Sequence, residues 1–314
     1  MTTKLRGVEF QQVWGASGVQ GFFGEGYRFH RFLEPFGLNF RGMTFVAKTT
    51  TLEAREGNMP LRSDFTPQEL FPKCVVVKPR QGIVLNSVGL SGPGAKALLE
   101  EGSWQMQIEP FFISFMSVAK EPSERHEELR KFIQLLGEYL PTFRTMVGLQ
   151  LNYSCPNVGL HTEALLNEVS TGLKIAAGLG IPLVPKFNLL LPVRAALQIA
   201  EHPNCDGICI SNTIPWGQLP DLIRWRELFG SDVSPLAHIG GGGLSGKPLL
   251  YLLEDWLLRA RGADFPKPIN AGGGILSLKD AQRIKRAGAA SIFLGSIAIL
   301  RPWRVANIIT AMNS

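Results

Sequence analysis

Short apolar runs alternate with helical patterns along the whole chain. Most of the runs lack an alternation of apolar and polar positions, which is typical of strands buried on both faces of a parallel sheet. The runs that we interpret as strands are Gln11–Gly15, Met43–Lys48, Pro110–Phe115, Met146–Asn152, Leu183–Phe187, Gly207–Asn212, Pro268–Ala271 and Ser291–Gly295.

The segments between these runs carry the signals of helices. Ser123–Leu140 places its apolar residues at helical spacing, with Ser123 as a possible cap and Pro141 after its end. Ser277–Gly288 has capping-box spacing at its start and a glycine at its end. Strands and helices therefore alternate from end to end.

Eight strands, each followed by a helix, predict an α/β fold, the closed (β/α)8 TIM barrel. An open doubly wound sheet is the alternative. The pattern shows no linker and no internal repeat, so we expect a single domain over residues 1–314. Two long connections, Thr51–Leu90 and Thr213–Gly243, follow strands and are expected as inserted loops that cover the carboxyl-terminal face, where barrel active sites lie.

Composition and charge exclude several classes of protein. The chain has 45% hydrophobic residues and a formal charge of +6, but no basic block interleaved with aromatic residues, so we expect no nucleic-acid partner. We also find no signal-peptide pattern and no apolar stretch of spanning length, and therefore expect a cytoplasmic protein without membrane attachment. The spacing of the four cysteines matches no zinc site, so no metal is expected, and Cys205 and Cys209 are interpreted as core residues.

Glycine-rich turns suggest that the ligand carries a phosphate. Gly240–Gly246 and Ala271–Ile275 each precede a helical pattern, and Gly295-Ser296 is a shorter turn of the same kind. Glycines at such places let backbone N–H groups point at an anion. Since barrels often bind phosphate near their seventh and eighth strands, these turns favour a phosphate-bearing ligand there.

Polar residues at the predicted strand ends are candidates for chemistry. Lys48 and Lys186 lie in buried-strand patterns, where a lysine needs a partner or an anion. Cys155 lies in a polar loop after a strand and is a candidate base or nucleophile. Four asparagines at strand ends or in loops could hold a planar ring rich in amide groups; they are Asn86, Asn152, Asn157 and Asn212.

Several segments resemble the dihydroorotate dehydrogenase family in the right order. The segment 48–58 resembles its KTxTxxxREGN motif, 86–90 its NSxGL loop and 151–157 its NxSCPN loop. The other matching segments are 15–19, Lys186, Asn212-Thr213, 242–246, 273–275 and Gly295-Ser296.

This resemblance implies FMN-dependent oxidation of dihydroorotate to orotate in pyrimidine synthesis. Cys155 would remove the C5 proton, with Lys48 beside flavin and substrate. The implied substrate-binding residues are Lys48, Asn86, Gly89, Leu90, Asn152, Asn157, Asn212 and Thr213. The implied FMN-binding residues are Ala16, Ser17, Gly18, Lys48, Asn152, Lys186, Ser211, Gly246, Gly273, Gly274, Gly295 and Ser296.

The resemblance leaves partners and substrate partly open. Cysteine at the base position implies the soluble class 1, commonly a homodimer, reducing either fumarate or, through a subunit with FAD and an iron–sulfur cluster, NAD. Ser91-Gly92 replaces the usual Pro-Asn, and Met59–Arg62 also departs from the family pattern, both at the pocket rim. The alternatives are an enzyme of the dihydropyrimidine (dihydrouracil) dehydrogenase type, which usually has histidine where Asn157 stands, and a catalytically silent flavin-binding barrel.

Overall fold

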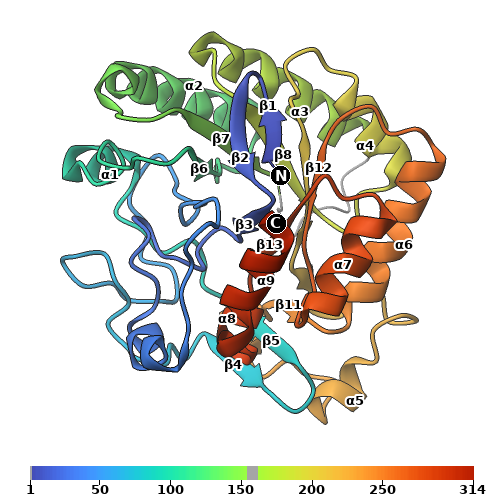
Figure 1. Cartoon of the computed structure of the whole chain (residues 1–314). Coiled ribbons are helices and arrows are strands. Elements are labelled where there is room, and N and C mark those ends of the chain that lie inside the picture. Colours follow the sequence, from blue (N-terminus) through green and yellow to red (C-terminus); the bar gives the residue numbers. More distant parts are fainter. Residues whose placement is uncertain (1, 154–161) are drawn as a thin grey trace.

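The computed structural model describes residues 2–153 and 162–314. Within these residues, seven parallel strands form one curled sheet in the order β3-β13-β12-β9-β8-β7-β6 (Figure 1). Their bounds are β3 Val13–Gly15, β6 Phe111–Phe115, β7 Val147–Asn152, β8 Leu183–Asn188, β9 Ile208–Asn212, β12 Ile269–Ala271 and β13 Ser291–Leu294.

The segment 44–50 closes this sheet into a barrel. It was predicted as part of a regular strand, but its backbone bonds first to β3 and then to β6. Thr44 N–H donates to Val13 at 2.9 Å, and Ala47 N–H donates to Phe112 at 2.9 Å. Because each neighbour pairs with only part of the segment, it forms parallel bridges at Thr44, Val46 and Thr50 instead of a continuous ladder. This segment occupies the eighth strand position, and the predicted (β/α)8 barrel is confirmed.

Helices surround the barrel (Figure 1). They are α1 Ala95–Glu101, α2 Pro122–Tyr139, α3 Thr162–Ala176, α4 Val193–Ala200, α6 Leu249–Gly262, α7 Leu278–Ala287, α8 Ile297–Leu300 and α9 Val305–Asn313. Ser277 caps α7 as predicted, by accepting a hydrogen bond from the N–H of Asp280. One expectation was wrong: β3 is followed by the 3₁₀ turns Arg28–Phe32 and Glu34–Phe36, not by an α-helix.

Aromatic packing fills the amino-terminal part of the barrel. The hairpin β1 (Thr2–Leu5) and β2 (Val8–Gln11) buries Leu5, Val8 and Phe10 against the interior. The Phe112 ring lies 4.4 Å from that of Phe10 and 4.5 Å from that of Trp14. The interior is therefore a packed core, and any open space lies toward the carboxyl ends of the strands.

The two predicted insertions meet in a second, antiparallel sheet with the order β10-β11-β5-β4. The first insertion supplies β4 (Val75–Lys78) and β5 (Ile83–Asn86), and the second supplies β10 (Ile214–Pro215), the short helix α5 (Trp225–Phe229) and β11 (Gly243–Gly246). The hairpin β4–β5 projects from the barrel in Figure 1. The insertions are thus partly ordered as strands.

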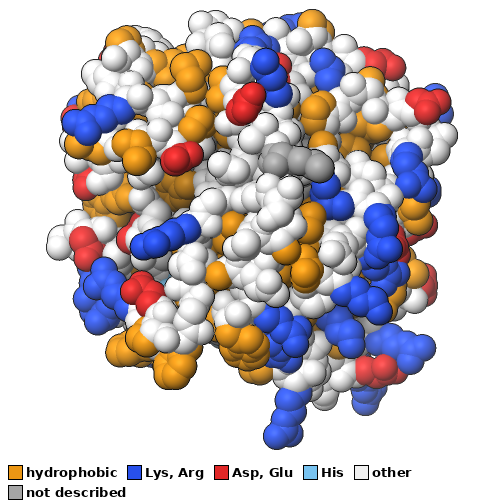
Figure 2. Space-filling model, viewed as in Figure 1, with side chains coloured by type: hydrophobic (Ala, Val, Ile, Leu, Met, Phe, Trp, Pro, Cys, Tyr) orange, Lys and Arg blue, Asp and Glu red, His pale blue; other side chains and the backbone are white. Residues whose placement is uncertain are grey.

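Lysines and arginines gather on one side of the face in Figure 2, over α6 and α7. Several of them are paired with acids on the same helices: Arg283 with Glu254, and Arg259 with Asp255 at 2.8 Å. The excess positive charge is thus partly neutralised locally. No helix within residues 2–153 and 162–314 has both the length and the apolar character needed to span a membrane.

Candidate active site

A cavity of about 1230 Å³ lies at the carboxyl ends of the barrel strands. Ligand pockets for a single small molecule typically measure about 300–1,000 Å³, so this one has room for a large cofactor and a small substrate. The predicted site residues that line it are Ala16, Ser17, Gly18, Lys48, Asn86, Gly89, Leu90, Asn152, Lys186, Ser211, Asn212, Thr213, Gly273, Gly274, Gly295 and Ser296. The fold therefore brings together residues that are up to 280 positions apart.

One face of the antiparallel sheet forms a wall of this cavity. In its register Pro215 lies opposite Gly243, Gly243 opposite Asn86, and Asn86 opposite Val75. Residues in such a row share a face, and all four line the cavity. The next row, Ile214, Leu244 and Leu85, is buried in a small core on the other face. The insertions thus supply a cavity wall, which places Asn86 at the site.

Thr49 links three parts of the barrel mouth, a role that the sequence analysis missed. Its hydroxyl lies 2.8 Å from the Ser17 hydroxyl and 2.9 Å from the Ser114 hydroxyl, and it accepts a hydrogen bond from Asn152 Nδ2 at 3.3 Å. The signal was its place directly after Lys48 at a strand end. This network fixes Asn152 at the carboxyl end of β7.

Lys48 is buried at the cavity. Its ammonium group donates to the carbonyl of Ser91 and lies 4.7 Å from the centre of the Phe22 ring. Burial lowers the pKa of Lys48 to about 8, because the charged form loses hydration. The residue is therefore a cation at neutral pH that can lose its charge just above it.

Lys186, on β8, is a buried cation facing the same cavity. The side chain is 5% exposed, and its ammonium group lies 5.7 Å from the centre of the Phe293 ring. In the described part of the chain no carboxylate and no hydrogen-bond acceptor contacts this ammonium group. Loss of hydration lowers its pKa. A buried cation of this kind is costly unless an anionic or electron-rich ligand compensates it.

All three glycine-rich stretches border the cavity, and two of them do so as turns directly after barrel strands. Gly273 and Gly274 follow β12, and a Cβ at Gly273 would lie 2.9 Å from the Ser211 hydroxyl. Gly295 follows β13, and a Cβ there would lie 3.0 Å from that of Ala16. A side chain at either position would collide with neighbouring protein atoms. Close packing therefore requires glycine there, and these turns, which we call the cradle, line the cavity with backbone alone.

The first glycine-rich stretch differs from its prediction as a phosphate turn before a helix. Its second half is the strand β11, which pairs with β5. Gly246 is not among the lining residues; a Cβ there would lie 2.2 Å from the carbonyl oxygen of Gly82. Glycine at this position is explained by close approach of two strands.

The two family-like loops at the rim are bonded to each other. Asn58 Nδ2 donates to the carbonyl of Ser87 at 2.7 Å, and the backbones of Arg55 and Gly92 exchange hydrogen bonds at 2.8 and 2.9 Å. Ser91, one of the departures from the family pattern, accepts from Met59 N–H at 3.0 Å through its hydroxyl. The departing residues therefore connect the two loops behind Lys48.

The predicted residues Cys155 and Asn157 lie outside the described residues. Cys205 and Cys209 are buried as expected for core residues. The cavity lining also includes residues that the sequence analysis did not select: Tyr27, Arg55, Lys120, Arg125, Trp216 and Phe293. Most of these lie in loops or insertions, where no strand pattern placed them beside the barrel mouth.

The fold and cavity define an α/β-barrel enzyme with a site large enough for a cofactor. The family model described as dihydroorotate dehydrogenase matches residues 1–314, and the chain belongs to this family. It is therefore an oxidoreductase of pyrimidine biosynthesis, from a family of FMN-dependent flavoproteins.

Some of the similar proteins are named for NAD(+) and others for fumarate. A catalytic subunit of dihydroorotate dehydrogenase B (NAD(+)) from Anoxybacillus flavithermus is 28% identical over 320 residues, covering 99% of this chain and 89% of that one. A dihydroorotate dehydrogenase A (fumarate) from Lactobacillus delbrueckii is 28% identical over 273 residues, covering 84% and 77%. A crystal structure of the Eimeria tenella enzyme with ferulenol has the same fold, with a TM-score of 0.69 at 18% identity, covering 99% and 82%.

Proposed function

We propose that this chain oxidises dihydroorotate to orotate with bound FMN. The observation that carries the proposal is the buried Lys186, whose ammonium group contacts no carboxylate or hydrogen-bond acceptor among the described residues. It lies in the same cavity as Lys48 and as Asn152 and Asn212, whose side chains are hydrogen-bonded to each other. Lys186 and the cradle of Gly273, Gly274 and Gly295 fit FMN, because they offer a cation and open backbone at one cavity. FMN, when bound, supplies a hydride acceptor at its N5 atom.

The chain's own residues would orient the ring and move a proton. Cys155 would take the proton from C5 of dihydroorotate, and the hydride acceptor that FMN supplies would balance the oxidation at C6. Asn86, Asn152, Asn212, Thr213 and Asn157 would hold the amide edges of the ring, and Gly89 and Leu90 would complete the pocket. Lys48, a cation at neutral pH, would hold the substrate's negative charge in a site from which water is largely excluded.

The phosphate of FMN is assigned to the turns after β12 and β13. Ala16, Ser17 and Gly18 lie next to them, because β3 pairs with β13. Ser211 lies beside Gly273, with its hydroxyl donating to the carbonyl of Gly272 at 2.9 Å. These residues would help to hold the cofactor, and Lys186 would compensate the negative charge that FMN gains on reduction.

The experiment is an anaerobic mix of the purified protein with dihydroorotate, followed at the flavin band near about 450 nm. Bleaching supports the proposed reaction. A yellow protein that dihydroorotate does not bleach but dihydrouracil does would indicate the dihydropyrimidine type. A yellow protein that neither compound bleaches would favour a catalytically silent flavin-binding barrel, and a protein that cannot take up FMN would contradict the proposal.

We also propose a single-domain chain that forms a homodimer in the cytoplasm. The relatives named as catalytic subunits suggest a second subunit as the electron acceptor, while the fumarate-using relatives suggest a self-contained enzyme. Adding fumarate or NAD to the reduced protein separates these cases. Reoxidation by fumarate indicates the self-contained form, and reoxidation by NAD only with an added FAD and iron–sulfur subunit indicates the other. Sedimentation gives the oligomeric state.

A further inference from the structure

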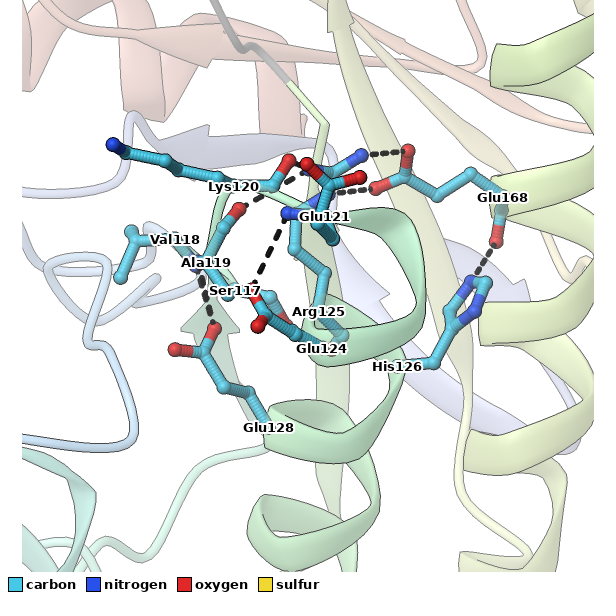
Figure 3. Close-up of polar contacts among 10 residues, drawn as sticks. All are labelled: Ser117, Val118, Ala119, Lys120, Glu121, Glu124, Arg125, His126, Glu128 and Glu168. Carbon is cyan, nitrogen blue, oxygen red and sulfur yellow. Dashed lines mark hydrogen bonds and ion pairs between the residues drawn. The ribbon is translucent and has the colours of Figure 1, made fainter.

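Residues 116–121, in the loop after β6, line the cavity. Side chains of α2 form hydrogen bonds with the backbone of this loop (Figure 3). The N–H groups of Val118 and Ala119 donate to the Glu128 carboxylate at 2.7 and 3.2 Å. Arg125 Nη1 donates to the carbonyls of Ala119 and Lys120 at 3.1 and 2.6 Å. The polar backbone of this loop is thereby turned toward α2 and away from a ligand.

Arg125 is itself neutralised. Its guanidinium makes two bonds to Glu168 of α3, each 2.6 Å long, and the ring of His126 bonds to the carbonyl of Glu168 at 3.2 Å. Paired, charge-assisted bonds of this kind are strong and geometrically specific. Arg125, Glu128 and Glu168, which we call the loop clamp, therefore fix the loop. Because Glu168 neutralises the guanidinium of Arg125, that group has little charge to offer a ligand.

Lys120 is the cation that this loop presents. Its side chain is exposed, lines the cavity, and extends away from Arg125, Glu121 and Glu168 in Figure 3. No ion pair to it exists in the described part of the chain. The cavity's other lysines, Lys48 and Lys186, are buried at its floor. Lys120 therefore stands nearer the solvent than either of them.

The order of the strands says which end of a bound ligand Lys120 would meet. Around the barrel, β12 is followed by β13, β3, the segment 44–50 and then β6. In a barrel of eight strand positions, β6 lies four positions from β12 and therefore opposite it. The glycine turn after β12 is assigned to the phosphate of FMN. Lys120 is thus across the barrel from the turn after β12 that is assigned to the phosphate, and it would meet the part of a bound ligand that lies farthest from that phosphate.

We propose that Lys120 is a recruitment residue that draws a carboxylate-bearing dihydropyrimidine into the cavity in preference to a neutral one, and that the loop clamp holds it in place. This inference rests on the proposed function. A cation at the mouth of a low-dielectric cleft raises the local concentration of an anion and speeds its association, in a way that added salt screens. It requires no part in the chemical step.

The test compares the FMN-loaded wild type with Lys120→Gln, Lys120→Glu and the control Lys131→Gln, an exposed lysine of α2 outside the cavity lining. Three quantities are measured: the second-order rate of flavin bleaching by dihydroorotate, the bleaching rate at saturating substrate, and the Kd of FMN. At low ionic strength Lys120→Gln should slow bleaching about three- to tenfold and Lys120→Glu more, both differences shrinking to about twofold or less in roughly 0.5 M KCl. The rate at saturating substrate and the Kd of FMN should stay within about twofold.

Four results would overturn the inference. An unchanged bleaching rate in Lys120→Gln, or a loss that persists in high salt, would show that the charge does not recruit substrate. A weaker Kd for FMN would assign the cation to the cofactor's phosphate instead. If dihydroorotate does not bleach even the wild-type protein, the proposed function is wrong and this inference is wrong with it. If the wild type bleaches but the Lys120 variants do not behave as expected, only the inference about Lys120 is wrong.

Discussion

Asn212 donates from its side-chain Nδ2 to the side-chain Oδ1 of Asn152 at 3.3 Å. The two residues end β9 and β7, with β8 between them, so this bond spans the mouth of the barrel above Lys186 on β8. Asn212 Oδ1 in turn accepts from Thr213 N–H at 2.9 Å, and Asn152 Nδ2 donates to Thr49. The orientation of both carboxamides is therefore set before a ligand binds, which lowers the entropy that binding must overcome.

Replacing Cys155 by alanine should abolish turnover without abolishing binding. Loss of a general base typically slows a reaction about 10²–10⁴-fold. Stopped-flow bleaching by dihydroorotate measures this, and the flavin spectrum with orotate checks binding. Cys205→Ala, which changes a buried core thiol bonded to the carbonyl of Gly207, is the control and should bleach at the wild-type rate. A Cys155→Ala protein with full activity would remove this residue from the mechanism.

Lys186→Met should have opposite effects on the protein with and without cofactor. Methionine keeps the packing on Phe293 but removes a buried charge that has no carboxylate or hydrogen-bond acceptor in contact with it among the described residues, so the apoprotein should become more thermostable. FMN should bind about 10- to 100-fold more weakly, the range expected for a lost charge-assisted hydrogen bond.

Thermal melts with and without FMN and a fluorescence titration of the apoprotein measure both effects of Lys186→Met. Lys174→Met, which changes an exposed lysine on α3 outside the cavity lining, is the control. Unchanged FMN affinity in Lys186→Met would place this lysine outside the cofactor site.

Orotate binding should weaken as the pH rises through about 8, where Lys48 loses its proton. The same shift affects stability. Since burial lowers the pKa of Lys48 from 10.5 to about 8, the unfolded chain holds a proton between these values that the folded chain has lost. The free energy of unfolding contributed by this group therefore rises with pH over that window and is flat below about pH 7.

The measurement for Lys48 is the difference in Tm between the wild type and Lys48→Met from pH 6 to 10.5. Taking the difference cancels the contributions of the other titrating groups, because both proteins share them. We expect this difference to move in favour of the wild type above about pH 8. A constant difference would mean that Lys48 keeps an ordinary pKa in the folded chain.

Gly243→Ala should disturb the substrate side of the cavity. A Cβ at this position would lie 2.2 Å from the Thr213 hydroxyl oxygen, so Thr213 and the neighbouring Asn212 must move. We expect a KM for dihydroorotate raised about tenfold or more, as for a lost hydrogen-bonding contact, with FMN retained. Gly178→Ala, where a Cβ meets nothing within 4 Å, is the matched control. Equal KM values in the two variants would contradict the role of this wall.

The sequence predicted the barrel and many of the residues around its mouth for a definite physical reason. A parallel sheet buried on both faces favours continuous apolar runs, so polar residues such as Lys48 and Asn212 are most informative where those runs end. All parallel strands end on the same side of a barrel, so residues at strand ends must meet. Glycine turns such as Gly273-Gly274 could be placed by the same argument.

Which residues of the inserted loops face the cavity could not be deduced from the ends of the barrel strands. The register of β5 against β11 decides that Asn86 faces the cavity and Leu85 does not, and a shift of one residue would exchange them. The same pairing brings Gly246, which was expected to contact phosphate, close to the backbone of Gly82. The segment 44–50 reads as an ordinary strand but divides its bonds between two neighbours.

The sequence by itself determined the fold class, the end of the barrel that carries the site, and most of the polar groups available there, because each depends on local periodicity and on where buried strands stop. Only the tertiary structure decided how those groups pair and which of them remain charged. Desolvation of Lys48 and Lys186, the bond between Asn152 and Asn212, and the clamp of Arg125 on Glu168 arise between elements distant in the chain. Their energies depend on distance and burial, which no linear pattern of residues records.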